Sequence, residues 1–202
     1  MASFSIHLAI GKRYMDKNKG EITDKRVFFD GIIAPDITDN KIATHYSLPY
    51  VERWQTNVEG KVFLPEYLAH GTYDGSDYEK GIFLHLVTDY IFFCHLLDKN
   101  YLDGITLFEF CNDLYHSYDL IADTIDNKYE IDYSNIREKI NENIAKGMKS
   151  KNVDVKNEKS KNILDVHELD EFIEYVSNIK IDTYIEKIML AGTNVLPDED
   201  YL

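Results

Sequence analysis

The chain has 202 residues, of which 44% are hydrophobic and 13% aromatic, and this composition is typical of one globular domain and not of a disordered segment. It carries 36 acidic and 22 basic residues, and the resulting formal net charge of −14 disfavours long nucleic acids and anionic membrane surfaces as partners. No apolar run approaches the roughly 18–20 residues that span a bilayer, and the first residues lack the order of a signal peptide. We therefore expect a cytoplasmic protein without a transmembrane segment.

Apolar residues recur along most of the chain at the spacing of an α-helix, and no segment shows the strict alternation of a strand. Ser3 or Ser5 is a candidate cap for the first helix, and Pro35 ends the second. The predicted helices span residues 3–18, 23–33, 51–57, 61–70, 78–97, 104–127, 132–147 and 164–190, the last of them open to a break near Asn178. The sequence predicts an all-α fold, in which residues 1–202 form a single helical bundle around a central buried helix at about 78–97.

Three segments have the composition of loops. Residues 34–50 contain two prolines together with Asp, Asn and Thr, which favour turns. Residues 147–162 are polar and Lys-rich, and we expect a surface loop there. Residues 192–202 are expected to form a loose tail.

The central helix carries three ionisable groups in apolar surroundings: His85, Asp89 and His95. His85 and Asp89 are four residues apart, so a helix places them on one face, roughly 40° apart. A buried carboxylate is costly unless a cation or a strong donor compensates its charge. A metal ion would provide that compensation and would also use the histidines.

Three further residues extend this candidate site. His7 lies on the first predicted helix, and Asp36 and His45 lie in the loop at 34–50. Imidazole nitrogen and carboxylate oxygen suit zinc and similar ions. The plainer alternative treats each residue separately, because a lone histidine on a helix is often only hydrogen-bonded and an aspartate after proline is often a turn residue. Periodicity alone leaves both interpretations open.

The order of these residues resembles the zinc-dependent phospholipase C family, which is similar in fold to the S1/P1-type nucleases. The resemblance rests on His7, Ala34-Pro35-Asp36, Thr44-His45-Tyr46 and the HxxxD from His85 to Asp89, and it covers roughly residues 1–120. It implies an all-α fold with a cluster of one to three zinc ions in a cleft.

The resemblance also implies a role for each residue. Asp36, His45, His85 and Asp89 would hold one metal ion. His7 would bind a neighbouring ion, with Asp89 bridging the two. Asp36 would also serve as a catalytic base.

A further zinc of the family is matched less completely. His95 corresponds to a family histidine six residues after the HxxxD aspartate. The family then has a histidine followed four residues later by glutamate, whereas this chain has His116 with Asp119 at the third position and Leu120 at the fourth. We therefore treat His95, His116 and Asp119 as additional candidate ligands.

These observations lead to one main hypothesis and two rivals. The main hypothesis is a metal-dependent phosphoric-ester hydrolase that acts on a small or lipid-like phosphoester. A non-catalytic helical protein that binds a metal or another ligand is the alternative from a different class. A phosphohydrolase of the HD type is disfavoured, because the chain contains no adjacent His-Asp pair.

Overall fold

The protein is all-α, as the sequence predicts. The computed structural model describes residues 2–38, 40–47, 62–70, 73–97, 105–134, 136, 138, 140–142, 145 and 159–197. Every regular element in these ranges is a helix. The helices are α1 (Phe4–Lys17), α2 (Lys25–Ile33), α3 (Lys41–Thr44), α4 (Leu64–His70), α5 (Asp77–Ile91), the π-helical η2 (Phe92–Leu96), α7 (Leu107–Tyr129), α9 (Val166–Ser177) and α10 (Ile181–Ala191).

Side chains that accept hydrogen bonds set the beginnings of several helices. The Ser3 side chain accepts from the backbone N–H of Ile6, which confirms the predicted cap of α1. Thr106 and Glu109 form a reciprocal capping box at the start of α7. At the starts of α2 and α5, the side chains of Asp24 and Ser76 accept backbone N–H groups of the first turn. Short polar residues thus fix where the helices start, and the apolar residues that follow decide how they pack.

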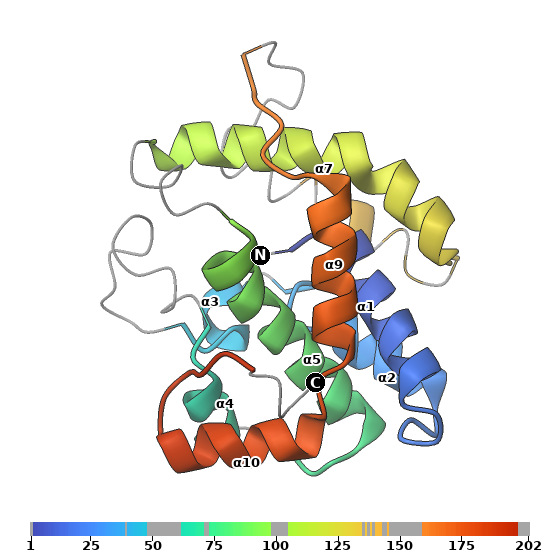
Figure 1. Cartoon of the computed structure of the whole chain (residues 1–202), viewed down its shortest axis with the longest axis vertical. Coiled ribbons are helices and arrows are strands. Elements are labelled where there is room, and N and C mark those ends of the chain that lie inside the picture. Colours follow the sequence, from blue (N-terminus) through green and yellow to red (C-terminus); the bar gives the residue numbers. More distant parts are fainter. Residues whose placement is uncertain are drawn as a thin grey trace.

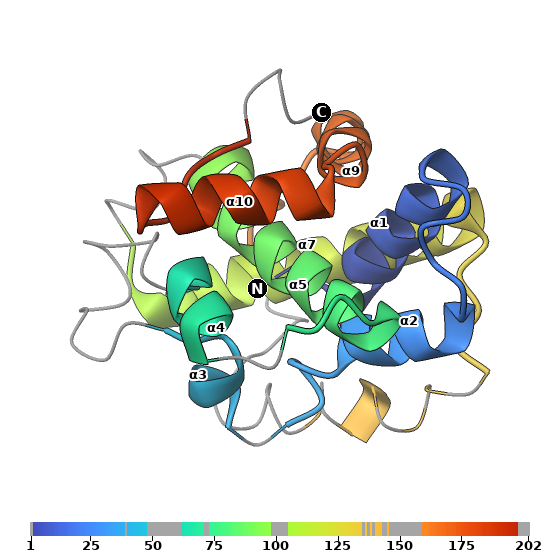
Figure 2. The same cartoon turned by 90° about the horizontal axis from the view of Figure 1, so that it is seen from below.

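The predicted central helix consists of α5 followed by η2, and it runs through the middle of the molecule (Figure 1). In that view α7 crosses one end of the bundle and α10 crosses the other. The view from below shows α2 alongside α5, with α10 on another side of it (Figure 2). The helix α5 contributes five apolar side chains to the core: Phe83, Leu84, Leu86, Val87 and Ile91.

α2 and α5 approach each other more closely than side chains normally allow, because two glycines meet at their contact. A Cβ built on Gly81 would lie 2.8 Å from the backbone nitrogen of Ile32 and 3.0 Å from the Cα of Gly31. A Cβ on Gly31 would in turn clash with the backbone carbonyl of Tyr78. The absence of side chains at both positions therefore brings the backbone of α2 against α5.

The C-terminal region agrees with one part of the prediction and differs from another. The segment expected as a helix at 164–190, open to a break near Asn178, forms α9 and α10 and is divided there. The first part of the expected loose tail is attached to the bundle, because the Asn194 side chain accepts from the N–H of Leu64 and donates to the carbonyl of Val62. The Tyr184 hydroxyl also donates to the Val195 carbonyl. Residues 198–202 lie outside the described part of the chain.

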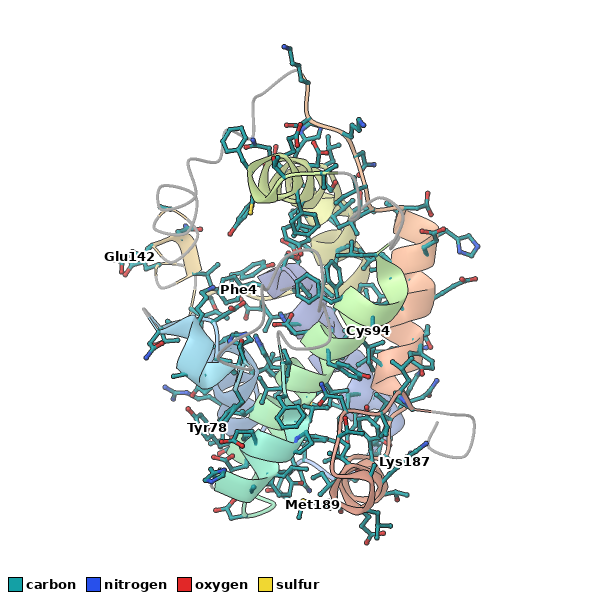
Figure 3. All side chains as sticks on the ribbon, turned by 90° about the vertical axis from the view of Figure 1, so that its left-hand side faces the viewer. Phe4, Tyr78, Cys94, Glu142, Lys187 and Met189 are labelled. Carbon is teal, nitrogen blue, oxygen red and sulfur yellow. The ribbon has the colours of Figure 1, made fainter. Side chains whose placement is uncertain are left out.

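Other predicted segments are described only in part. The expected helix at 51–57 lies outside the described residues, and of the helix at 132–147 the structure shows helical backbone at 138, 140–142 and 145. Residues 159–162 are the described end of the Lys-rich segment, and the N–H of Lys161 donates to Asp113 on α7. Figure 3 shows the side chains packed densely around α5, with Lys187 and Met189 at the periphery on α10. None of the described helices is long and apolar enough to cross a membrane.

Candidate metal centre

The structure brings the five predicted ligand residues together in the interior. His7 comes from α1, Asp36 from the turn after α2, His45 from the C-terminal end of α3, and His85 and Asp89 from successive turns of α5. All five are at most 3% exposed to solvent. Their side-chain atoms form two overlapping groups in which all ligand atoms lie within 4.8 Å of one another: His7, His85 and Asp89, and Asp36, His45 and His85. The described residues therefore include a buried histidine and aspartate cluster that could hold a metal ion.

The carboxylate of Asp89 divides the cluster into two halves. Its Oδ1 lies 3.4 Å from Nε2 of His7 and accepts the backbone N–H of Ala2 at 2.6 Å. Its Oδ2 lies 3.1 Å from Nε2 of His45 and 3.6 Å from Nε2 of His85. One carboxylate oxygen thus faces each half, which is the arrangement of a bridging ligand.

Backbone carbonyls fix which nitrogen carries the proton on two of the imidazole rings. Nδ1 of His45 lies 2.8 Å from the carbonyl oxygen of Lys41, and Nδ1 of His85 lies 2.7 Å from that of Ile32. A carbonyl can only accept, so both Nδ1 atoms are donors. Each Nε2 atom is then unprotonated and carries a lone pair. The two Nε2 atoms lie 3.1 Å apart, and both face Asp89. Positive charge, from a proton or a metal ion, is needed between them, and an imidazole held by a backbone carbonyl is the usual state of a metal ligand.

His7 has the environment of a ligand whose partner is a cation. Both of its ring nitrogens are buried without a hydrogen-bond partner, and the same holds for Oδ2 of Asp89. Buried polar atoms are nearly always paired, so this group of orphaned atoms calls for an explanation. The His7 ring stacks on that of His85, with centroids 3.8 Å apart and planes 8° from parallel. The stacked rings thus stand side by side next to Asp89, where His7 and His85 could share one ion or bind two neighbouring ions.

Asp36 belongs to the group of ligand atoms that does not include His7. Its Oδ1 lies 3.8 Å from Nε2 of His45 and 2.8 Å from the ammonium of Lys41. The loop is closed by the Thr44 hydroxyl, which donates to the carbonyl of Pro35 at 2.8 Å. Thr44 precedes His45 and Pro35 precedes Asp36, so this bond positions the two candidate ligands relative to each other.

Burial and charge set the protonation states of the cluster. Burial, the largest influence, raises the pKa of Asp36, but the neighbouring His85 ring and the Lys41 ammonium outweigh it, and the pKa lies below the ordinary value of 3.8. Burial also raises the pKa of Asp89, yet nearby positive charge and the surrounding histidines bring it well below 3.8. For His85, burial lowers the pKa below 6.5. Ionised carboxylates and a neutral imidazole are the states in which these side chains bind metal.

Of the three additional candidate ligands, His116 and Asp119 are not part of this cluster, and the side chain of His95 is not among those described. The backbone of His95 lies in η2, but its side chain is outside the described part of the structure. His116 is half-buried on α7 and Asp119 is exposed there, because that helix directs Asp113 and Ser117 inward. Neither His116 nor Asp119 belongs to the two groups of ligand atoms that could share an ion.

Sequence reasoning missed two contributors to the site. The first is Lys41, whose position four residues before His45 on a short helix is a signal that could have revealed it. The second is Tyr118 of α7, which is partly buried against the core, and the pKa of its phenol is raised well above 10.0 by burial first and then by the charge of Asp89. This residue of α7 therefore lies close enough to Asp89 to be affected by its charge.

The fold and the cluster define an all-α protein with a buried group of histidines and aspartates that could hold a metal ion. Comparison of the chain with protein-family models, with curated proteins and with solved structures gives no match. The resemblance to zinc-dependent phospholipase C thus continues to rest on the order of the five residues alone.

Proposed function

We propose that the protein is a metal-dependent phosphoesterase of the zinc-dependent phospholipase C type, acting on a small or lipid-like phosphoester and, as the sequence predicts, working in the cytoplasm. The observation that carries this proposal is the pair of opposed Nε2 lone pairs on His45 and His85, 3.1 Å apart, which face Oδ2 of the ionised Asp89 at 3.1 Å and 3.6 Å. This arrangement is unfavourable without positive charge at its centre.

Zinc is the ion that we favour, because neutral imidazoles and carboxylates are its common ligands in hydrolytic sites. In this proposal Asp36, His45, His85 and Asp89 hold one ion, and His7 holds a second ion that shares Asp89. When bound, such ions acidify water to a pKa of about 7 and neutralise negative charge on a phosphoester.

The residues of the chain supply the rest of the function. The carbonyls of Ile32 and Lys41 hold two imidazoles in the ligand tautomer. Burial of the cluster excludes bulk water, which strengthens its electrostatic interactions. We assign the role of proton acceptor during hydrolysis to Asp36, as the family resemblance implies, and its ion pair with the partly exposed Lys41 supports an approach to it from solvent.

A second candidate function follows from how deeply the ligands are buried. Closed four-coordinate sites are typical of structural zinc, whereas hydrolytic sites keep a position open for water or substrate. A non-catalytic protein with a structural metal site would have the same five residues at the same depth.

The metal content of the freshly purified protein, measured by mass spectrometry, tests the first part of the proposal. We expect at least one equivalent of zinc, which a strong chelator removes and added zinc restores. Replacing His85 with Ala should abolish retention, and His167→Ala is the matched control because that histidine is on the surface of α9 with its side chain 82% exposed. A wild-type protein that binds no zinc or manganese when they are supplied would rule out the metal centre.

Turnover of a chromogenic phosphodiester tests the second part. We expect hydrolysis that stops with chelator and returns with zinc, in wild type and in His167→Ala but not in His85→Ala. Zinc binding without hydrolysis, accompanied by loss of folding when the metal is removed, would favour the structural site instead.

A further inference from the structure

Lys41 reaches the candidate metal centre from the solvent side. Its ammonium lies 2.8 Å from Oδ1 of Asp36, and its side chain is 31% exposed, whereas that of Asp36 is 4% exposed. The ion pair thus stands where the buried cluster meets the surface. A ligand that approaches Asp36 from solvent meets Lys41 first.

The backbone of Lys41 is attached to the cluster independently of its side chain. Its carbonyl oxygen accepts the Nδ1 proton of His45 at 2.8 Å, at the beginning of α3. The base of the side chain is therefore fixed beside the centre. The four-carbon stem is flexible, so the ammonium can change partners without moving the histidine.

A metal ion and the ammonium would compete for the same carboxylate. Oδ1 of Asp36, which binds the ammonium of Lys41, is also the oxygen closest to Nε2 of His45, at 3.8 Å. An ion held between Asp36 and His45 would lie within a few ångströms of the ammonium, and two positive charges at that distance repel strongly. Binding of the ion therefore favours release of Lys41 from Asp36.

We propose that Lys41 exchanges partners, pairing with Asp36 in the metal-free protein and with a phosphoryl oxygen of the substrate when metal is bound. Lys41 is then the residue that gives the site its preference for anionic phosphoesters. This inference rests on the proposed function, since it requires an ion that Asp36 helps to hold. It adds a residue that the order of metal ligands does not reveal.

Two binding measurements on the full chain test the exchange. Zinc affinity is measured by competition with a chromophoric chelator, and binding of inorganic phosphate to the zinc-loaded protein is measured by titration calorimetry. In Lys41→Met we expect zinc to bind about tenfold more tightly, because its competitor is gone, and phosphate to bind about tenfold more weakly, because a charged hydrogen bond is lost. Lys41→Arg keeps the charge and should keep phosphate affinity within about threefold of wild type.

The opposite signs of the two changes distinguish partner exchange from a structural role. Lys19→Met is the matched control, because it removes the same charge from the exposed turn after α1 and should change neither affinity. Unchanged phosphate affinity in Lys41→Met, or a loss of zinc affinity together with phosphate affinity, would overturn the inference. Zinc-dependent turnover by the wild type would then still support the proposed function. Failure of the wild type to bind zinc would overturn the proposed function and this inference with it.

Discussion

Replacing Gly81 with Ala tests whether the close contact of α2 and α5 positions the metal centre. The new Cβ would lie 2.8 Å from the nitrogen of Ile32 and 3.0 Å from the Cα of Gly31, and it would clash with the carbonyl of Phe28. All three are backbone atoms, so no side-chain rotation can relieve the contact. Ile32 is also the residue whose carbonyl accepts the Nδ1 proton of His85 at 2.7 Å. The substitution therefore acts on the fold and on the cluster together.

The size of the effect follows from the geometry. Ordinary van der Waals contacts of a Cβ begin at 3.4 Å and the Phe28 carbonyl oxygen would lie far inside that distance, so α2 has to retreat by about one ångström. Overpacking of this kind costs about 1–3 kcal/mol, and a clash with rigid backbone belongs at the upper end. Alanine regains about 1 kcal/mol over glycine within a helix. We expect a net loss of about 2 kcal/mol in the free energy of unfolding, and a fall in zinc affinity of about 10–100-fold as the support of His85 is lost.

Chemical denaturation and zinc competition measure these two effects. Gly11→Ala is the matched control, because its Cβ would meet the Cδ1 atom of Ile32, at the end of a side chain that can move. We expect this control to lose less than about 1 kcal/mol and to keep zinc affinity. A Gly81→Ala protein with wild-type stability and wild-type zinc affinity would refute the argument, since it would mean that the two helices are not in backbone contact.

Three further predictions concern separate parts of the molecule. His7→Ala should lower the number of zinc ions per chain by one and leave the other in place, as measured by mass spectrometry; an unchanged number would exclude His7 as a ligand of a separate ion. Asp77→Asn should cost about 1 kcal/mol at neutral pH, because the carboxylate at the start of α5 accepts the backbone N–H and the hydroxyl of Thr23 in a solvent-exposed position. Burial raises the pKa of Asp77, but these bonds outweigh it and the pKa lies below 3.8. In denaturation at several pH values, the loss of unfolding free energy relative to wild type should be full above pH 3.8. It should vanish as the pH falls through the lower pKa of the folded state. Thr44→Val removes the bond to the Pro35 carbonyl and should cost about 1 kcal/mol in unfolding and weaken zinc binding, whereas equal zinc affinity would show that this bond does not position the loop.

The sequence predicts the parts of the centre that depend on local geometry. His85 and Asp89 are one helical turn apart, so their shared face follows from the helix period alone, and their burial follows from the apolar residues around them. The meeting of these two residues with Asp36 depends on how the loop folds back, which no local pattern specifies. Only the order of the residues along the chain indicated that contact, through its resemblance to a known family.

Other features depend on backbone atoms that a residue pattern does not identify. The carbonyl of Ile32 is the acceptor for His85 because the glycines at 31 and 81 let α2 approach, and glycine is equally common in turns. The division of the C-terminal segment near Asn178 is likewise not specified by the residue pattern. No proline or glycine marks the break, so the sequence is consistent with one helix or with two. Tertiary packing decides such cases.

The charge of the centre resolves an apparent conflict between the composition and the proposed substrate. A chain with a net charge of −14 repels anions over most of its surface. In the cluster, however, the negative charges of Asp36 and Asp89 are opposed by the ammonium of Lys41 beside Asp36 and by positive charge near Asp89. One divalent ion is enough to make the centre positive, and this charge is local because the cluster is buried. The protein would then attract a compact phosphoester at one point while repelling polyanions elsewhere, a form of selectivity in which the acidic surface and the cationic centre act together.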